Sequence, residues 1–456
     1  MVFSSAEFLA LFFPCVLLVY YNPFFRSRRF RNVFLLLASL LFYAWGEPVR
    51  VLLLLASIAV NWWFGLRVEG ERPHRRGLLA ASVVFNLAGL FVFKYLGFVC
   101  RNLALLGLNV PQIKLALPIG ISFYTFQAMS YVIDVYRKKS PAQRSVLDVG
   151  LYISFFPQLI AGPIVRYETV ALEIHSRKES WEDFCGGVPR FIVGLGKKVI
   201  LANNMAVVAD AAFRSADLSA AMAWLGAAAY ALQIYFDFSG YSDMAIGLGR
   251  MFGFHFLENF DRPYLASSIT DFWRRWHISL STWFRDYVYI PLGGNRVSPR
   301  RHLFNLFAVW LLTGIWHGAN WTFILWGLGY FLLLMAEKYG HIDRKLGILR
   351  RPYTLLCVLL LWVLFRADSL GAAGRYFAAM FTGGRGSCDD FLYYFGNMKA
   401  YLAAAVVCCL PLDKLWRRVP ERARDSLEAA GTIALLVITL TYVVSSTYNP
   451  FIYFNF

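Results

Sequence analysis

Apolar residues occur in long blocks that short polar connectors separate. The blocks at 51–61, 77–93 and 432–444 contain no charged residue. A helix needs about 20 apolar residues to cross the hydrocarbon core of a bilayer. Several other blocks are shorter or contain proline and glycine, which indicates broken or re-entrant segments packed inside a bundle. The pattern therefore predicts an all-α polytopic membrane protein with roughly 10–12 membrane segments, some of them re-entrant.

The order of blocks and connectors predicts where the spans lie. We expect 166–183 to be a charged surface segment and 218–253 to be a span with a broken continuation. The chain has no convincing internal repeat, which weighs against many transporter folds. The predicted spans are 7–21, 32–45, 51–66, 78–98, 115–136, 151–165, 191–212, 218–253, 353–365, 401–412 and 431–445. We predict one membrane domain over 1–456, with a core at 115–340, peripheral helices at 1–114 and 350–448, and a tail at 449–456.

Composition excludes a soluble globule. Only 16% of the 456 residues are charged and 58% are hydrophobic, whereas soluble domains contain about 25% charged residues. The net charge is +17, and basic segments alternate with apolar spans, which suits membrane topology better than nucleic-acid binding. Basic connectors stay in the cytoplasm, so we expect these connectors inside and both termini outside. The basic connectors are 26–31, 67–76, 137–144, 343–351 and 414–424.

Signals of several other classes are missing from the sequence. Residues 1–20 lack a basic start and a small-residue cleavage site, so we expect the first span to be retained. The seven cysteines form no CxxC pair and no metal-ligand spacing, so we expect neither disulfides nor a metal. No strand precedes the glycines of 247–253, which favours helix packing over a dinucleotide-binding loop.

One polar stretch, 271–295 (DFWRRWHISLSTWFRDYVYIPLGGN), places charged residues among aromatic ones. On a helix, Trp273, His277, Ser281 and Arg285 would share one face. Charged groups at this density are costly in lipid and tend to face a cavity or one another. We expect a re-entrant or interfacial helix that ends at the Pro-Leu-Gly-Gly segment and lines a pore entrance. The alternative is a cytoplasmic amphipathic helix with its arginines at the lipid phosphates.

A second stretch, 311–326 (LLTGIWHGANWTFILW), contains a single ionisable residue, His317, between two apolar arms. An ionisable residue inside a membrane is a functional hypothesis by default. Gly314 and Gly318 let another group approach the backbone closely. A neutral imidazole can take a proton from a hydroxyl near pH 7, which is the work of a general base. We therefore favour a catalytic His317 over a structural histidine bonded across helices.

A third stretch, 235–249 (YFDFSGYSDMAIGLG), contains Asp237, Ser239, Ser242 and Asp243 at the end of a predicted span. These side chains could line a cavity or bond neighbouring helices. We favour the structural role.

Together these segments resemble the membrane-bound O-acyltransferase family. Within the family, the likeness is to the bacterial branch typified by the alginate O-acetylase and the D-alanyl transfer protein of teichoic acid modification. The resemblance implies a ring of helices around a thin centre where a cytoplasmic and an outer funnel meet. It implies a catalytic histidine at His317 and a second family histidine at His277. The segments that carry the resemblance are 117–137, 155–167, 235–249, 271–296 and 313–327.

The resemblance also implies a function. We expect an enzyme that moves an acetyl group from cytoplasmic acetyl-CoA, a substrate and not a bound cofactor, to an extracytoplasmic acceptor, for O-acetylation of an exopolysaccharide or cell-wall glycan of the alginate type. The alternatives are D-alanyl transfer to teichoic acid from a carrier protein, a transporter, and a structural subunit of a polysaccharide export complex. Lys197, Lys198, Arg274 and Arg275 are candidates to meet the CoA phosphates. The expected tunnel or substrate residues are Trp316, Asn320, Trp273, Arg274, Arg275 and Asp237.

The tail 449–456 (NPFIYFNF) contains no charged residue, so we expect it to be docked. It is either an aromatic anchor at the membrane interface or a segment that presents Tyr453 toward His317 as an acyl relay. In the second case Tyr453 would pass its acetyl group to an extracytoplasmic SGNH-type acetyltransferase or another envelope polysaccharide-modifying protein. The expected location is the bacterial inner membrane, with membrane lipid and no nucleic acid as partners.

Overall fold

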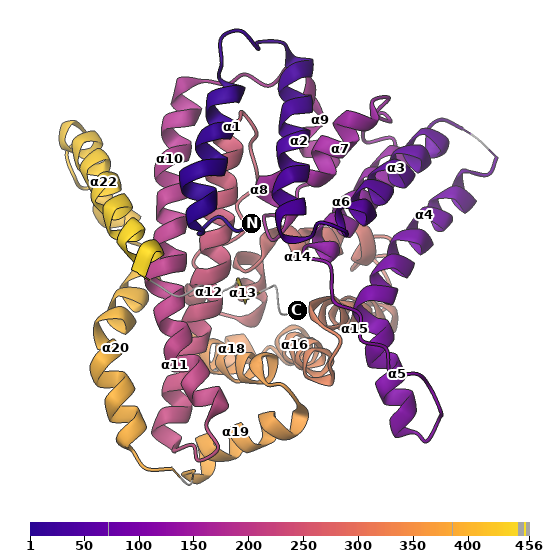
Figure 1. The fold of residues 1–456 in the computed structure, drawn as a ribbon. Coiled ribbons are helices and arrows are strands. Elements are labelled where there is room, and N and C mark those ends of the chain that lie inside the picture. The colour runs from indigo at the N-terminus through magenta and orange to yellow at the C-terminus, as the bar shows by residue number, and fades with distance from the viewer. Residues whose placement is uncertain (72, 385, 446–450, 453–456) are drawn as a thin grey trace. The chain divides into compact units, whose positions relative to one another are not determined.

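The fold is helical throughout the part of the chain that can be described. The computed structural model describes residues 1–71, 73–384, 386–445 and 451–452, and only the backbone of residues 414 and 415. Within these ranges the only non-helical pairing is an isolated bridge between Ser219 and Gly384 (Figure 1). The all-α prediction is confirmed.

The chain divides into two compact units. The first comprises Met1–Phe191 and Tyr241–Leu257, and the second comprises Ile192–Gly240 and Glu258–Phe456. Two helices, α10 (Trp181–Gly196) and α12 (Ala220–Met251), contribute residues to both units. The division into one core and peripheral helices stays a prediction.

In the first unit, α3 packs against α4, α6 and α7, and α2 packs against α7 (Figure 1). The elements of this unit, besides its parts of α10 and α12, are η1 (Phe8–Phe12), α1 (Phe13–Tyr20), α2 (Arg28–Gly46), α3 (Val51–Val68), α4 (Arg75–Leu90), η2 (Phe91–Tyr95), α5 (Leu96–Leu105), α6 (Ile121–Tyr136), α7 (Val146–Ser154), α8 (Phe156–Leu159) and α9 (Tyr167–Ser176).

In the second unit, α15 and α16 form a tightly packed hairpin, and α18 packs against α16 and α19 (Figure 1). The elements of this unit, besides its parts of α10 and α12, are η3 (Lys197–Ala202), α11 (Asn203–Arg214), η4 (Pro263–Leu265), α13 (Ile269–Arg275), α14 (Ile278–Phe284), η5 (Arg285–Tyr289), α15 (Pro299–His317), α16 (Trp321–Gly340), α17 (Ile342–Lys345), η6 (Gly347–Leu349), α18 (Arg350–Arg366), α19 (Leu370–Thr382), α20 (Asp389–Cys408), α21 (Asp413–Trp416) and α22 (Glu421–Ser445).

Among the described residues, five helical stretches are long and apolar enough to cross a membrane. Large apolar side chains on them are open to the surroundings; Val437 and Val444 of α22 are 57% and 83% exposed. Such surfaces suit lipid and not water. The prediction of a multi-pass membrane protein is confirmed, while the count of membrane segments stays a prediction. The five stretches are Val51–Val68, Arg75–Leu105, Trp181–Arg214, Gly347–Arg366 and Glu421–Ser445.

Serine side chains set the start of several helices. Ser27, Ser145, Ser268 and Ser369 each accept a hydrogen bond from the backbone N–H three residues further on, at 3.2, 3.3, 3.0 and 3.2 Å. Each serine satisfies one of the N–H groups that the first turn of a helix leaves without an intrahelical partner. The local sequence therefore determines where these four helices begin.

Two predicted helix boundaries are wrong. The span expected at 115–136 begins only at Ile121, because Pro118 and the left-handed Gly120 (φ 73°) keep the preceding residues out of the helix. The break expected in 218–253 does not occur, since α12 runs without interruption to Met251.

Gly247, near the end of α12, serves helix packing, as predicted. A Cβ added at Gly247 would lie 2.6 Å from the carbonyl oxygen of Gly187 and 2.7 Å from the backbone nitrogen of Phe191. No side chain could fit there, so the glycine lets α12 and α10 approach backbone to backbone within the first unit.

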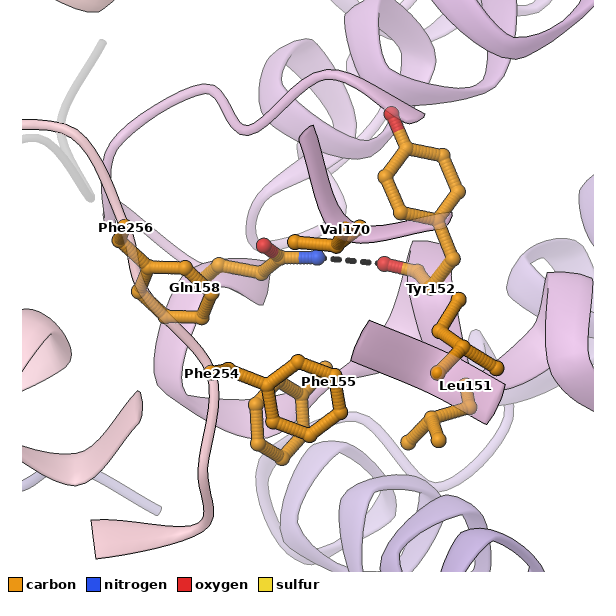
Figure 2. Close-up of a pocket in the computed structure, with 8 residues that line it drawn as sticks. Leu151, Tyr152, Phe155, Gln158, Val170, Phe254 and Phe256 are labelled. Carbon is orange, nitrogen blue, oxygen red and sulfur yellow. Dashed lines mark hydrogen bonds between the residues drawn. The ribbon is translucent and has the colours of Figure 1, made fainter. Parts of the chain in front are cut away.

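The first unit also contains a small cavity between α7, α8 and α9 (Figure 2). Gln158 points its amide across this cavity and donates a hydrogen bond to the backbone carbonyl of Tyr152. The cavity volume is about 10 Å³, about the minimum that one water molecule requires. It is too small for an acyl group or a sugar and is a feature of packing.

A polar cluster joins the start of α2 to the loop between α9 and α10. The Glu179 carboxylate accepts hydrogen bonds from Tyr20 and Arg28, each at 2.5 Å, and forms an ion pair with Arg31 at 3.0 Å. The Arg177 side chain is fully buried and lies 3.5 Å from the same carboxylate. Burial alone would raise the pKa of Glu179, but the bonds from Arg28 and Tyr20 outweigh it and lower the pKa from 4.5 to about 2. Glu179 is thus held ionised.

Candidate active site

His317 is the last residue of α15, at the turn into α16. A Cβ added at Gly314 would lie 2.5 Å from the carbonyl oxygen of Phe323, and one added at Gly327 would lie 2.4 Å from that of Trp310. Glycine at both positions lets the two helices touch along their backbones. The tight hairpin fixes the position of His317, which is 3% exposed.

Aromatic rings surround the imidazole of His317. The ring centroids of Trp326, Trp316 and Phe365 lie 4.8, 5.0 and 5.2 Å from its own, all in edge-on arrangements. An aromatic enclosure of this kind excludes bulk water, so electrostatic interactions inside it are stronger than in water. The residue that the sequence singled out lies in a dry, rigid setting.

The predicted continuous helix across 271–290 is wrong, because the chain breaks at the second histidine. α13 ends at Arg275, Trp276 is extended (φ −103°, ψ 128°), and His277 takes a left-handed conformation (φ 45°, ψ 54°) before α14 begins. Trp273 and His277 therefore do not share one helical face. The break turns His277, which is 1% exposed, into the interior.

Asn259 supports this break. It is fully buried; its backbone carbonyl accepts the Ile278 N–H at 2.9 Å, and its side-chain oxygen accepts the N–H and the hydroxyl of Ser279 at 3.2 and 2.9 Å. A non-glycine residue in a left-handed conformation costs roughly 1–3 kcal/mol, and these bonds help to hold His277 there. Asn259 could not be identified from the sequence, because a capping partner 20 residues away leaves no local spacing signal.

Trp316 brings the two histidines into one site. Its ring centroid lies 5.0 Å from that of His317 and 6.0 Å from that of His277. On its other side, the His277 ring lies 4.5 Å from Phe238 of α12. Two of the predicted catalytic residues and one predicted tunnel residue thus form a continuous group of side chains.

Trp273 lies behind this group. Its ring is 4.8, 4.9 and 5.7 Å from those of Trp310, Tyr330 and Trp326, and Trp326 in turn faces His317. Trp273 therefore supports the wall beside the imidazole and does not contact it in any ring pair described.

The other predicted site residues have separate surroundings. Asn320 caps α16 through its side-chain oxygen and donates to the carbonyl of Asp368 at 2.8 Å. Arg275 forms ion pairs with Asp271 at 2.9 Å and Asp261 at 3.5 Å, whereas Arg274 is exposed. Their roles toward a substrate stay predictions.

Asp237 is buried on α12, and its carboxylate lies 2.6 Å from the Lys198 ammonium. Lys198 is therefore engaged inside the fold and does not extend a basic surface, whereas its neighbour Lys197 is partly exposed. This pairing could not be predicted, because a partner 39 positions away leaves no signal in the local spacing of α12.

Tyr453 lies outside the described residues. The two residues before it are buried: Phe451 is 3% and Ile452 is 7% exposed. The Ile452 N–H donates a hydrogen bond to the Asp237 carboxylate at 2.7 Å. This part of the tail is docked, as its apolar sequence predicts.

Comparison with known proteins assigns a family to this fold and site. The sequence model of the membrane-bound O-acyltransferase family matches residues 137–341, which include both histidines. The chain is 42% identical to a probable alginate O-acetylase of Pseudomonas putida, over the whole length of both proteins. It is 46% identical to the probable alginate O-acetylase of Pseudomonas aeruginosa, over 84% of this chain and 75% of that protein. It is also 33% identical to a peptidoglycan O-acetyltransferase of Helicobacter pylori, over 100% and 98% of the two chains.

Proposed function

Since this chain belongs to the membrane-bound O-acyltransferase family and is an O-acyltransferase, we propose that it moves an acetyl group from acetyl-CoA to a hydroxyl acceptor outside the cytoplasm. The product is an O-acetylated exopolysaccharide or cell-wall glycan of the alginate type. One observation carries the proposal: His317 and His277 meet through Trp316 inside a buried aromatic enclosure. A polar pair in such a setting suits proton transfer at a dry reaction centre.

In the proposed reaction, a nitrogen of His317 takes the proton of the acceptor hydroxyl. The oxygen forms a bond to the carbonyl carbon of the thioester, and the carbonyl electrons move to its oxygen. When this intermediate collapses, the carbon–sulfur bond breaks, and the CoA thiolate leaves with the proton that His317 held. His277 orients the donor or stabilises the developing oxyanion. Electrostatic stabilisation of this kind is strong where water is excluded.

The donor carries negatively charged phosphates, and the chain offers basic groups to receive them. Arg274 is exposed and Lys197 is partly exposed, so both side chains reach a surface. Arg275 shares its charge with two aspartates and serves better as a secondary contact. The proposed cytoplasmic entry agrees with the basic connectors, which would stay on that side of the membrane.

The sidedness has its own test. Arg29 lies in a basic connector, and a cysteine placed there in a cysteine-free background should stay unlabelled by an impermeant thiol reagent added to intact cells. Labelling from outside would overturn the proposed orientation.

The decisive experiment measures acetyl transfer from acetyl-CoA by the purified protein in lipid nanodiscs, beside His317→Gln. The wild type should transfer the acetyl group of acetyl-CoA to an added oligosaccharide or to its own Tyr453, and the variant should do neither. A protein that binds no acetyl-CoA but transports or exports the glycan would overturn the proposal. Consumption of a D-alanyl carrier protein in place of acetyl-CoA would redirect it to the alternative donor.

Tyr453 is proposed as the acyl relay that hands the acetyl group to an extracytoplasmic transferase. Phenols have a pKa near 10 and become nucleophilic once a neighbouring base takes the proton. Tyr453→Phe keeps an aromatic ring and removes only the hydroxyl. Loss of glycan acetylation at normal protein levels is expected; acetylation at the wild-type level would refute the relay and leave an aromatic anchor.

A further inference from the structure

α12 presents a buried carboxylate to the C-terminal end of the chain. One oxygen of Asp237 lies 2.6 Å from the Lys198 ammonium, and the other accepts the Ile452 N–H at 2.7 Å. The two charged side chains are 2% and 6% exposed. Hydrogen bonds to a charged acceptor are short and strong, so this contact is a specific one.

The local backbone brings Lys198 to this position. Lys198 lies in η3 (Lys197–Ala202), a turn of π-helix between α10 and α11, which is a rare backbone conformation. Gly240, one turn after Asp237, permits the approach: a Cβ there would lie 2.7 Å from the Gly194 carbonyl oxygen and 3.1 Å from the Cβ of Lys197. The pair therefore depends on two unusual features of neighbouring helices.

From Asp237 the contacts lead to the active site. Phe451 precedes Ile452, and its ring centroid lies 6.0 Å from that of Phe238. Phe238 lies 4.5 Å from His277, so the tail and the histidine pack on the same phenylalanine ring. Phe260 packs on the same ring at 5.0 Å, so a displacement of Phe451 would remove one of the contacts that set the orientation of Phe238 against His277.

A buried ion pair is a weak source of stability, because the cost of removing two charges from water can exceed their attraction. Two apolar residues of similar volume would often serve stability as well. The pair at Asp237 has a third contact, with a backbone N–H that apolar side chains could not bind. Its specific contribution is to fix where the tail lies.

We propose that Asp237 is a positioning residue of the acyl-transfer site. With Lys198 as its counter-ion, it holds Phe451 and Ile452 against α12 and so keeps Phe238 in place beside His277. Phe451 and Ile452 are thus part of the wall of the active site. The kinetic part of this proposal rests on the proposed acetyl transfer, and the structural part does not.

Two double variants test it. Asp237→Leu with Lys198→Met and Asp237→Asn with Lys198→Met both remove the two charges, so neither leaves an unpaired buried ion. Only the asparagine variant keeps a side-chain oxygen that can accept the Ile452 N–H. Hydrogen exchange of the peptide that contains Phe451 and Ile452 reports docking, and local opening speeds this exchange.

In the leucine variant, the amide hydrogens of this peptide should exchange at least about tenfold faster than in the wild type. Its kcat should fall about tenfold, because small displacements at a reacting centre are costly, while the KM for acetyl-CoA changes less than about twofold. The asparagine variant should restore protection and most of kcat. Equal behaviour of the two variants in exchange, or intact protection in the leucine variant, would overturn the proposal.

A third variant leaves the ion pair untouched. Ile452→Pro removes the donated N–H, since proline has none, and Ile452→Val keeps it. The kcat of the proline variant should fall about as far as that of the Asp237→Leu double variant, and the kcat of the valine variant should stay near the wild-type value. Equal kcat values in the proline and valine variants would overturn the proposal. If the wild type transfers no acetyl group, the exchange measurements still decide whether Asp237 holds the tail, so the two failures are distinguishable.

Discussion

The Glu179 cluster and the His317 site both bury ionisable side chains, but they do so in opposite ways. Around Glu179, three arginines and a tyrosine converge on one carboxylate in a loop. The imidazoles of His317 and His277 pack instead against the aromatic rings of Trp326, Phe365, Phe238 and Trp316. In the first arrangement the polar groups form hydrogen bonds and ion pairs with one another, which stabilises the fold. The second encloses its imidazoles in aromatic rings that exclude bulk water, which suits a site that must act on a substrate.

The largest expected effect concerns His317. His317→Ala should lower acyl transfer by roughly 10²–10⁴-fold, the usual contribution of a general base, with thermal unfolding little changed. His317→Gln is the matched control, since it keeps a polar side chain of similar size without a base. Steady-state rates of acetyl transfer check both variants. Activity near the wild-type level in either would remove the distinction between the two regions.

Glu179→Gln should have the opposite effect, a loss of stability without a loss of catalytic rate. Breaking a buried ionic cluster by removing one partner should cost on the order of 3 kcal/mol in the free energy of unfolding, while the folded fraction keeps its kcat. Thermal unfolding in detergent measures the first quantity. Glu71→Gln is the control, because the Glu71–Lys138 pair is exposed on both sides and such pairs contribute little. An equal loss of unfolding free energy in Glu179→Gln and Glu71→Gln would contradict a stabilising role for the Glu179 cluster.

The same cluster predicts an acid dependence. The pKa of Glu179 is lowered in the folded protein, to about 2 from 4.5, so its stabilisation is fully present above pH 4.5. It is lost as the pH falls from about 4.5 toward 2. Unfolding curves of the wild type and Glu179→Gln should therefore converge over this window. Curves that stay parallel down to pH 2 would show that Glu179 is not held ionised by its arginines.

His277 should show an intermediate effect on catalysis. His277→Asn removes the imidazole but tolerates the left-handed backbone, so the turn should persist while kcat falls about 10²-fold, at the low end of what a group that stabilises an oxyanion contributes. His277→Gly is the comparison, because it also accepts this conformation. If only the KM for the donor rises, His277 serves uniform binding and not the transition state.

The smallest effect is expected at His255, in the loop after α12. Burial lowers its pKa, but the Glu173 and Asp183 carboxylates outweigh that and raise the pKa above 6.5. Its stabilisation is therefore present below pH 6.5 and is lost as the pH rises through the raised pKa. The ring is half exposed, so His255→Gln should cost less than about 1 kcal/mol. Unfolding midpoints at pH 5.5 and 8.5 measure this, and a cost that grows with pH would be the wrong sign.

Several features could be predicted from local sequence because their causes are local. The apolar blocks predicted a helical membrane protein, since a helix satisfies its own backbone in lipid. The motif around His317 marked a buried ionisable residue between two glycines that pack a hairpin. The expected packing role was confirmed for Gly247 of α12 for the same reason, since a glycine in a tight helix contact is visible in the local sequence.

The broken helix at His277 shows where local reasoning failed. Periodicity alone favoured one helix through 271–290, and nothing adjacent in the chain argues against it. The break depends on Asn259 binding Ile278 and Ser279, and that partner is supplied by the fold. The pairing of Asp237 with Lys198 and Ile452 was missed for the same reason, since its members are far apart in sequence.

The sequence by itself determined that the chain is an all-α, multi-pass membrane protein, and it supplied the prediction that His317 and His277 carry the chemistry. Only the tertiary structure decided that Trp316 joins those histidines, that His277 sits in a left-handed turn, and that Asp237 binds the end of the chain. The physical reason is that hydropathy and helix geometry act between near neighbours, whereas a buried polar group takes whichever partner the packed fold places beside it.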